Sequence, residues 1–102
     1  MDATLRRFIL TRDRECLAYK FDKQHVCRDK WGTEHWPSDQ ERLTIEHVKH
    51  DLGMGIKAND DAESMVAMCW AANVGVPSKV LRAFCREYLT NTNRAYPYRA
   101  PR

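Results

Sequence analysis

The chain has 102 residues, with 17 Lys or Arg against 14 Asp or Glu, so its formal net charge is +3. This length predicts one domain with a small core that a bound metal ion would help to stabilise. No apolar run approaches the roughly 18 residues of a membrane span, and the segment 8–10 is too short for a signal sequence. We therefore expect a soluble, cytoplasmic protein that does not bind membranes, with cysteines that are thiols or metal ligands rather than disulfides.

The first predicted element is a helix that begins after Asp2, a residue type that caps helix N-termini. Leu5, Phe8 and Ile9 recur at helical spacing and share one face. The other faces carry arginines, which are either solvated or in contact with phosphate. These arginines are Arg6, Arg7, Arg12 and Arg14.

No apolar period is visible between Cys16 and Trp36, so we expect a loop that is organised by something other than apolar burial. Soft and imidazole side chains are concentrated there, namely Cys16, His25, Cys27 and His35. Residues 37–42 are polar and predict a turn that leads into the next element.

The segment 43–49 predicts a half-buried strand, because Leu43, Ile45 and Val48 alternate with polar residues. The alternation is broken where Glu46 and His47 stand side by side. Glycine, Asn and Asp in residues 50–61 predict a loop. A second apolar run then ends in Cys69, and Asn73 follows four positions later. A hairpin followed by one helical turn would bring Glu46, His47 and Asn73 together.

The last predicted element is an amphipathic helix after Ser78, separated from the preceding helical turn by Gly75 and Pro77. Its apolar stripe includes Cys85, which we interpret as a core thiol. The outward positions are Lys79, Arg82, Arg86 and Glu87. We expect residues 1–90 to form a single domain and residues 91–102 to form a basic, disordered tail.

The segment 43–73 resembles the HNH endonucleases, which are treble-clef nucleases with a ββα-metal core. The family's Asp-His pair on the first strand corresponds to Glu46-His47, its strand-ending Cys to Cys69, and its helical Asn or His to Asn73. The wider run 12–89, with its segments 28–32 and 77–79, is similar to small HNH proteins of actinobacterial phages. The resemblance implies an α+β fold: a small ββα-metal (treble-clef, His-Me finger) core with an N-terminal helix and a C-terminal amphipathic helix.

Two features depart from the family pattern. Ser64 stands where the family usually has its middle Asn, and Asn59 is the nearby Asn. The paired C-x2-C knuckles of many members are incomplete, because Tyr19 and Ala72 replace the second cysteine of each. The usual four-cysteine zinc site therefore cannot form.

The implied activity is metal-dependent cleavage of DNA. Phosphodiester hydrolysis needs a base for the attacking water, which a neutral imidazole suits, and a cation at the phosphate. His47 would be the base, and Glu46 and Asn73 would supply oxygen ligands to Mg²⁺ or Mn²⁺. The expected supporting residues are His50, Asn59 and Ser64. The expected DNA-binding residues are Arg6, Arg7, Lys49, Lys57 and Lys79. The resemblance also suggests a setting in the host cytoplasm beside a phage terminase or packaging proteins.

Cys16, Cys27 and Cys69 with His25 form a candidate set of ligands for structural zinc, and His35 is the substitute for His25. Alternatively, the zinc has been lost and the thiols are buried beneath Trp31, Trp36 and Trp70. Two other functions use the same residues. One is a treble-clef module that binds DNA or a partner without cutting, and the other is a structural zinc protein of a virion or packaging complex.

Overall fold

A computed structural model describes residues 2–48, 61–74 and 79–95. Residues 50–60 of the predicted loop 50–61, with the candidate residues His50, Asn59 and Lys57, lie outside the described residues. So do Lys49, the predicted helix breakers Gly75 and Pro77, the predicted cap Ser78, and residues 96–102 of the predicted tail. No helix of the described segments is long and apolar enough to cross a membrane.

Helix α1 (Ala3–Asp13) begins as predicted, because the Asp2 carboxylate accepts a hydrogen bond from the Thr4 amide at 2.9 Å. Leu5 and Ile9 are buried on its inner face. The helix ends at Arg14, whose φ of 66° is rare outside glycine and whose amide donates to the Leu10 carbonyl at 2.8 Å. This sharp end turns the chain toward Cys16.

The centre of the fold is an antiparallel hairpin of β3 (Leu43–His47) and β4 (Met65–Cys69). Its register runs without interruption from the Leu43–Cys69 pair to the His47–Met65 pair. All of β4 is buried, which agrees with its apolar sequence, whereas β3 is mostly half-buried. The predicted hairpin is confirmed, and β4 is its inner strand.

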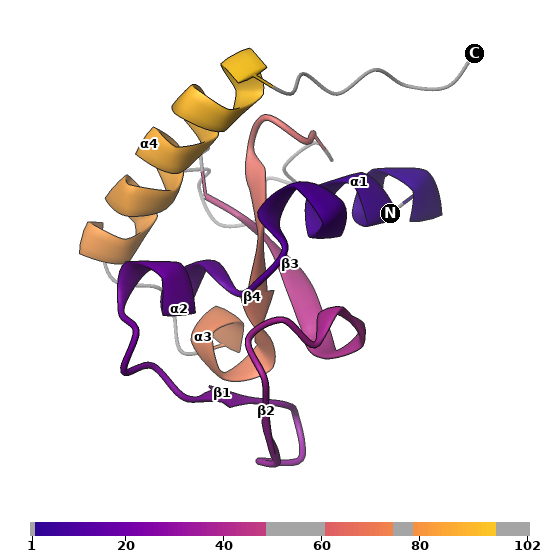
Figure 1. The fold of residues 1–102 in the computed structure, drawn as a ribbon, viewed down its shortest axis with the longest axis vertical. Helices are drawn as coiled ribbons and strands as arrows, with labels where there is room; N and C mark the ends of the chain where they lie inside the picture. Colours follow the sequence, from indigo (N-terminus) through magenta and orange to yellow (C-terminus); the bar gives the residue numbers. More distant parts are fainter. Residues whose placement is uncertain (1, 49–60, 75–78, 96–102) are drawn as a thin grey trace, which may run out of the picture.

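Two further helices follow the hairpin, α3 (Trp70–Val74) and α4 (Lys79–Ala95). Figure 1 shows α1 and α4 on opposite sides of the hairpin, with α3 at the end where β4 stops. Leu81, Cys85 and Leu89 form the buried stripe of α4, as the periodicity predicts. The helix is longer than predicted, however, because residues 91–95, which we assigned to the tail, continue it to Ala95.

The region before β3 contains more regular structure than the predicted loop. It folds into α2 (Leu17–Phe21), β1 (Cys27–Arg28), β2 (Glu34–His35) and a 3₁₀ turn at Gln40–Arg42. The β1–β2 turn needs glycine, since Gly32 has a φ of 78° and donates its amide to the Asp29 carbonyl at 3.0 Å. This small hairpin lies below α3 in Figure 1, apart from the main hairpin.

Side chains from α1 form hydrogen bonds with the edge of β4 that faces away from β3, where a third strand would otherwise pair. The Asp13 carboxylate accepts from the Ala67 amide at 2.8 Å, and Arg12 donates to the Met65 carbonyl at 2.6 Å. Tyr88 on α4 donates its hydroxyl to Asp13 at 2.7 Å. The Arg12 side chain is only 1% exposed, so its prediction as a solvated or phosphate-contacting residue is wrong. Its charge instead joins α1 to β4.

Candidate metal centre

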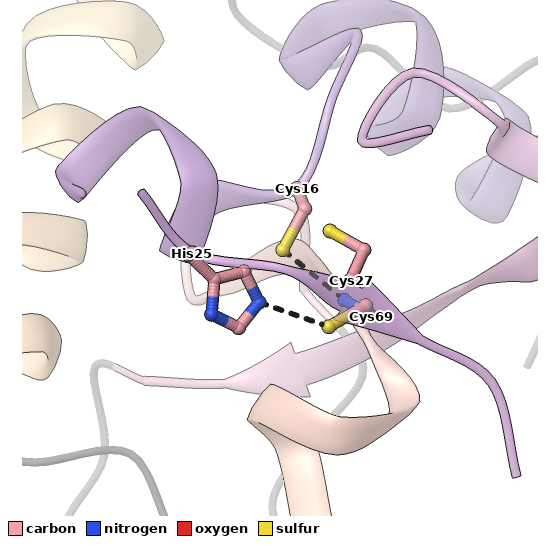
Figure 2. A group of neighbouring side chains, drawn as sticks. All are labelled: Cys16, His25, Cys27 and Cys69. Atoms are coloured by element: carbon pink, nitrogen blue, oxygen red, sulfur yellow. Dashed lines mark hydrogen bonds between the residues drawn. The ribbon is translucent and has the colours of Figure 1, made fainter. Parts of the chain in front are cut away.

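Three thiols and one imidazole converge beside the β4–α3 junction. The ligand atoms of Cys16, His25, Cys27 and Cys69 all lie within 4.8 Å of one another. Figure 2 shows the four side chains pointing toward a common centre. They come from the start of α2, the loop before β1, β1 itself and the end of β4. The predicted ligand set is therefore brought together from segments far apart in sequence.

Hydrogen bonds to sulfur hold this arrangement. The Cys69 amide donates to Cys16 Sγ at 3.3 Å, and the Ala72 amide donates to Cys69 Sγ at 3.4 Å. His25 Nε2 lies 3.3 Å from Cys69 Sγ. The backbone of Cys16 is fixed separately, because its amide donates to the Pro37 carbonyl at 3.0 Å. The first turn of α3 thus directs an amide at a ligand sulfur, a contact that favours thiolate.

The thiols also perturb one another. Hydrogen bonds from Cys16 and then Cys27 hold the pKa of Cys69 well below its ordinary range. For Cys27, hydrogen bonds with Cys16 and Cys69 raise the pKa well above its ordinary range, and burial adds to this effect. The three sulfurs are thus joined by hydrogen bonds through their thiol protons. A cation at the centre would replace those protons.

The donor set fits a closed zinc site. Tetrahedral ligands with zinc–sulfur bonds of about 2.3 Å lie roughly 3.8 Å apart, which the 4.8 Å limit accommodates. Thiolate and imidazole donors suit zinc rather than magnesium. Cys16, Cys27 and Cys69 are at most 1% exposed, as expected of a structural site without an open position. A metal such as zinc can therefore bind here.

The substitute ligand His35 lies outside the cluster. His35 faces Cys27 across the β1–β2 pair, but its Nδ1 lies 2.8 Å from the Trp36 carbonyl and it is not one of the four clustered residues. Of the three tryptophans expected beside the thiols, Trp31 and Trp36 are 79% and 80% exposed and Trp70 is 40% exposed. Cys85 lies elsewhere in the core, and burial raises the pKa of its thiol to about 12. It is a core thiol, as predicted.

A second group of polar residues lies on β3 and α3. Asn73 Nδ2 donates to Thr44 Oγ1 at 2.7 Å, and this hydroxyl donates to the Met68 carbonyl at 2.9 Å. Because strand side chains alternate between faces, Glu46 lies on the same face of β3 as Thr44. The predicted ligands Glu46 and Asn73 thus share a face. Sequence reasoning missed Thr44, although its position two residues before Glu46 could have indicated it.

His47 has a different position. The regular register of β3 and β4 extends through Glu46 and His47, so their side chains leave opposite faces of the hairpin. The Glu46 carboxyl is 21% exposed and lies 3.9 Å from the Arg82 guanidinium. Burial raises the pKa of Glu46, and the charges of Arg82 and His47 oppose that rise. Arg82, predicted to face outward, therefore belongs to this group.

The remaining predicted site residues have varied surroundings. Ser64 is buried, and its carbonyl accepts the Val48 amide at 2.9 Å, just beyond the end of β3. Arg6 donates to the Leu43 carbonyl at 2.8 Å, so part of its guanidinium supports β3. Arg7 and Lys79 are exposed and accessible to a nucleic acid.

No family model, curated protein or solved structure matches the chain.

Proposed function

We propose that the protein is a metal-dependent endonuclease of the HNH type that binds and cuts DNA. We propose that it acts beside a phage terminase. One observation carries the proposal: the hairpin β3–β4 and the helix α3 set Glu46 and Asn73 on one face, beside a clustered Cys3His centre. Oxygen donors gather on that face, while soft donors gather at the centre. The two donor sets suit two different metals.

Each proposed ligand has a defined task. Glu46 and Asn73 would hold Mg²⁺ or Mn²⁺, and Thr44 orients the Asn73 amide through the 2.7 Å hydrogen bond. When bound, the ion would stabilise charge on the phosphate and on the departing oxygen. His47, at the last position of β3, would remove the proton of the attacking water. Since it leaves the opposite face from Glu46 in a regular strand, it would act through a relaying water.

The Cys3His centre would hold zinc as a structural element. Cys69 is the last residue of β4, and α3 begins at the next residue. A zinc ion bound at Cys69 would fix the start of α3 against the segment 16–27. The orientation of Asn73 would then depend on zinc, although zinc would take no part in the chemistry.

We expect His47→Ala to reduce cleavage of plasmid DNA by about two or more orders of magnitude, the usual contribution of a positioned base. The fold should persist, because His47 ends the strand. The nicking rate would be measured with magnesium, with manganese and with EDTA. His35→Ala, in the small β1–β2 hairpin, is the matched control and should cleave normally. An unchanged rate in His47→Ala would remove His47 from the mechanism.

Alanine at Glu46 or Asn73 should weaken cleavage, with partial recovery at higher metal concentration, because a lost ligand lowers metal affinity before it alters the chemistry. Titrating magnesium at fixed DNA concentration measures the shift. Glu63→Ala removes an exposed carboxylate from the turn before β4 and should leave the titration unchanged. Cleavage that is as fast in EDTA as in magnesium would refute a metal-dependent mechanism.

The second candidate is a module that binds DNA without cutting it. Two observations favour it: Arg82 already lies beside Glu46, and Glu46 and His47 leave opposite faces. Such a module would shift a DNA duplex in a binding assay and leave plasmid intact with every divalent ion tried. The same pair of assays therefore separates the two candidates.

A further inference from the structure

Two arginines of α4 contact the end of β3 in comparable ways. Arg82 Nη2 donates to the His47 carbonyl at 3.2 Å, and Arg86 Nε donates to the Val48 carbonyl at 2.9 Å. They are four residues apart and so lie on the same side of the helix. Arg82 differs because its other terminal nitrogen lies 3.9 Å from the Glu46 carboxylate.

The pair between Arg82 and Glu46 is electrostatic rather than a fixed hydrogen bond, since 3.9 Å exceeds hydrogen-bonding distance. Both side chains are about one-fifth exposed, 20% for Arg82 and 21% for Glu46. Their attraction is therefore less screened than on an open surface, yet solvent and ligands can reach them. A planar guanidinium in this position suits a phosphate oxygen, which arginine binds with paired N–H groups.

We propose that Arg82 binds a DNA phosphate at this site and serves as the counter-charge of Glu46 until DNA arrives, so that DNA and the divalent ion bind cooperatively. The inference rests on the proposed nuclease function, because it assumes that Glu46 is a metal ligand. It adds a residue and a coupling that the proposed ligand set lacks.

Charge explains the cooperativity. In the free protein, the guanidinium repels a divalent cation that approaches Glu46. When a phosphate pairs with Arg82, that positive charge is neutralised, and the Glu46 carboxylate can accept the ion. By linkage, the ion must improve DNA binding by the same factor. The hydrogen bond from Arg82 to the His47 carbonyl also places the bound phosphate next to the backbone of the candidate base.

The test compares three variants. Arg82→Ala removes the charge and the contact with β3. Arg82→Gln removes the charge but can still donate to the His47 carbonyl. Arg86→Ala, the matched control, removes the equivalent contact one helical turn away and leaves Arg82 in place. Thermal melting of the three variants reports any structural cost that they share.

The readout is Mn²⁺ affinity, measured by electron paramagnetic resonance with and without a short duplex of cleavage-resistant phosphorothioate DNA. In the wild type and in Arg86→Ala, the duplex should strengthen Mn²⁺ binding by about tenfold, within the usual range of coupling between two sites. In both Arg82 variants, Mn²⁺ should bind more tightly without DNA, and the duplex should have little further effect.

Coupling that persists in Arg82→Gln would overturn the inference, as would its absence from the wild type or its loss in Arg86→Ala as well. These outcomes are separate from the failure of the proposed function. A protein that binds Mn²⁺ and duplex cooperatively but never cuts would disprove the nuclease and leave the role of Arg82 intact. A protein that cuts DNA without this coupling would support the nuclease and disprove the role of Arg82.

Discussion

Cys27→Ser is expected to abolish tight zinc binding and to lower the melting temperature sharply. Zinc bound to peptides contributes roughly 10–16 kcal/mol, which equals or exceeds the roughly 5–15 kcal/mol that keeps a typical domain folded. The elements around the centre are short: β1 has two residues, and α2 and α3 have five each. They depend on the shared ligand site, because each is too small to be stable alone.

Elemental analysis of dialysed wild-type protein should find about one zinc per chain, and circular dichroism should follow the melting of each variant. Magnesium should not displace this zinc, because thiolates discriminate against hard ions. Cys85→Ser is the matched control, since it changes a buried thiol outside the cluster. It should lose some stability and keep its zinc. If wild-type protein without zinc melted cooperatively at the same temperature as protein supplied with zinc, all four thiols would be only core residues.

The metal cluster could be predicted from sequence because thiol and imidazole side chains bind metal ions whatever fold brings them together. Cysteines that are expected to stay reduced, an imidazole two residues from Cys27 and a segment without apolar period together indicate a shared metal ion. The geometry confirms that Cys16, His25, Cys27 and Cys69 meet. The sequence gives less reason to choose His25 over His35 as the fourth ligand. In the structure His25 belongs to the cluster, whereas His35, although opposite Cys27 across β1 and β2, does not.

The environments of the charged residues could not be predicted in the same way. Arg12 and Arg82 occupy positions that helical periodicity assigns to solvent, yet both donate to backbone carbonyls at strand edges. Those edges exist only after β3 and β4 have paired, so the local sequence carries no signal of them. Likewise, α2 and the β1–β2 pair are too short for a period to reveal. Two of these elements adjoin a clustered residue, since α2 begins just after Cys16 and β1 begins at Cys27.

The buried pair of Arg12 and Asp13 predicts the largest effect of a single substitution outside the metal centre. Asp13→Ala should lower the free energy of unfolding by about 3–5 kcal/mol, the usual cost of leaving a buried charge without its partner. The Arg12 side chain, which is 1% exposed, would lose its paired carboxylate, and the Ala67 amide would lose its acceptor. Urea denaturation followed by circular dichroism measures the difference.

Three comparisons distinguish this network from an ordinary salt bridge. Glu34→Ala breaks the exposed pair with Arg28, in which the side chains are 64% and 47% exposed, and should change stability by less than about 1 kcal/mol. Tyr88→Phe removes one donor to Asp13 and should cost about 1–3 kcal/mol. Replacing Arg12 and Asp13 together with Met and Leu should cost less than Asp13→Ala, because no unpaired charge is left in the core. If Asp13→Ala proved as mild as Glu34→Ala, the edge of β4 would not depend on these side chains, and another contact would have to hold α1 against the hairpin.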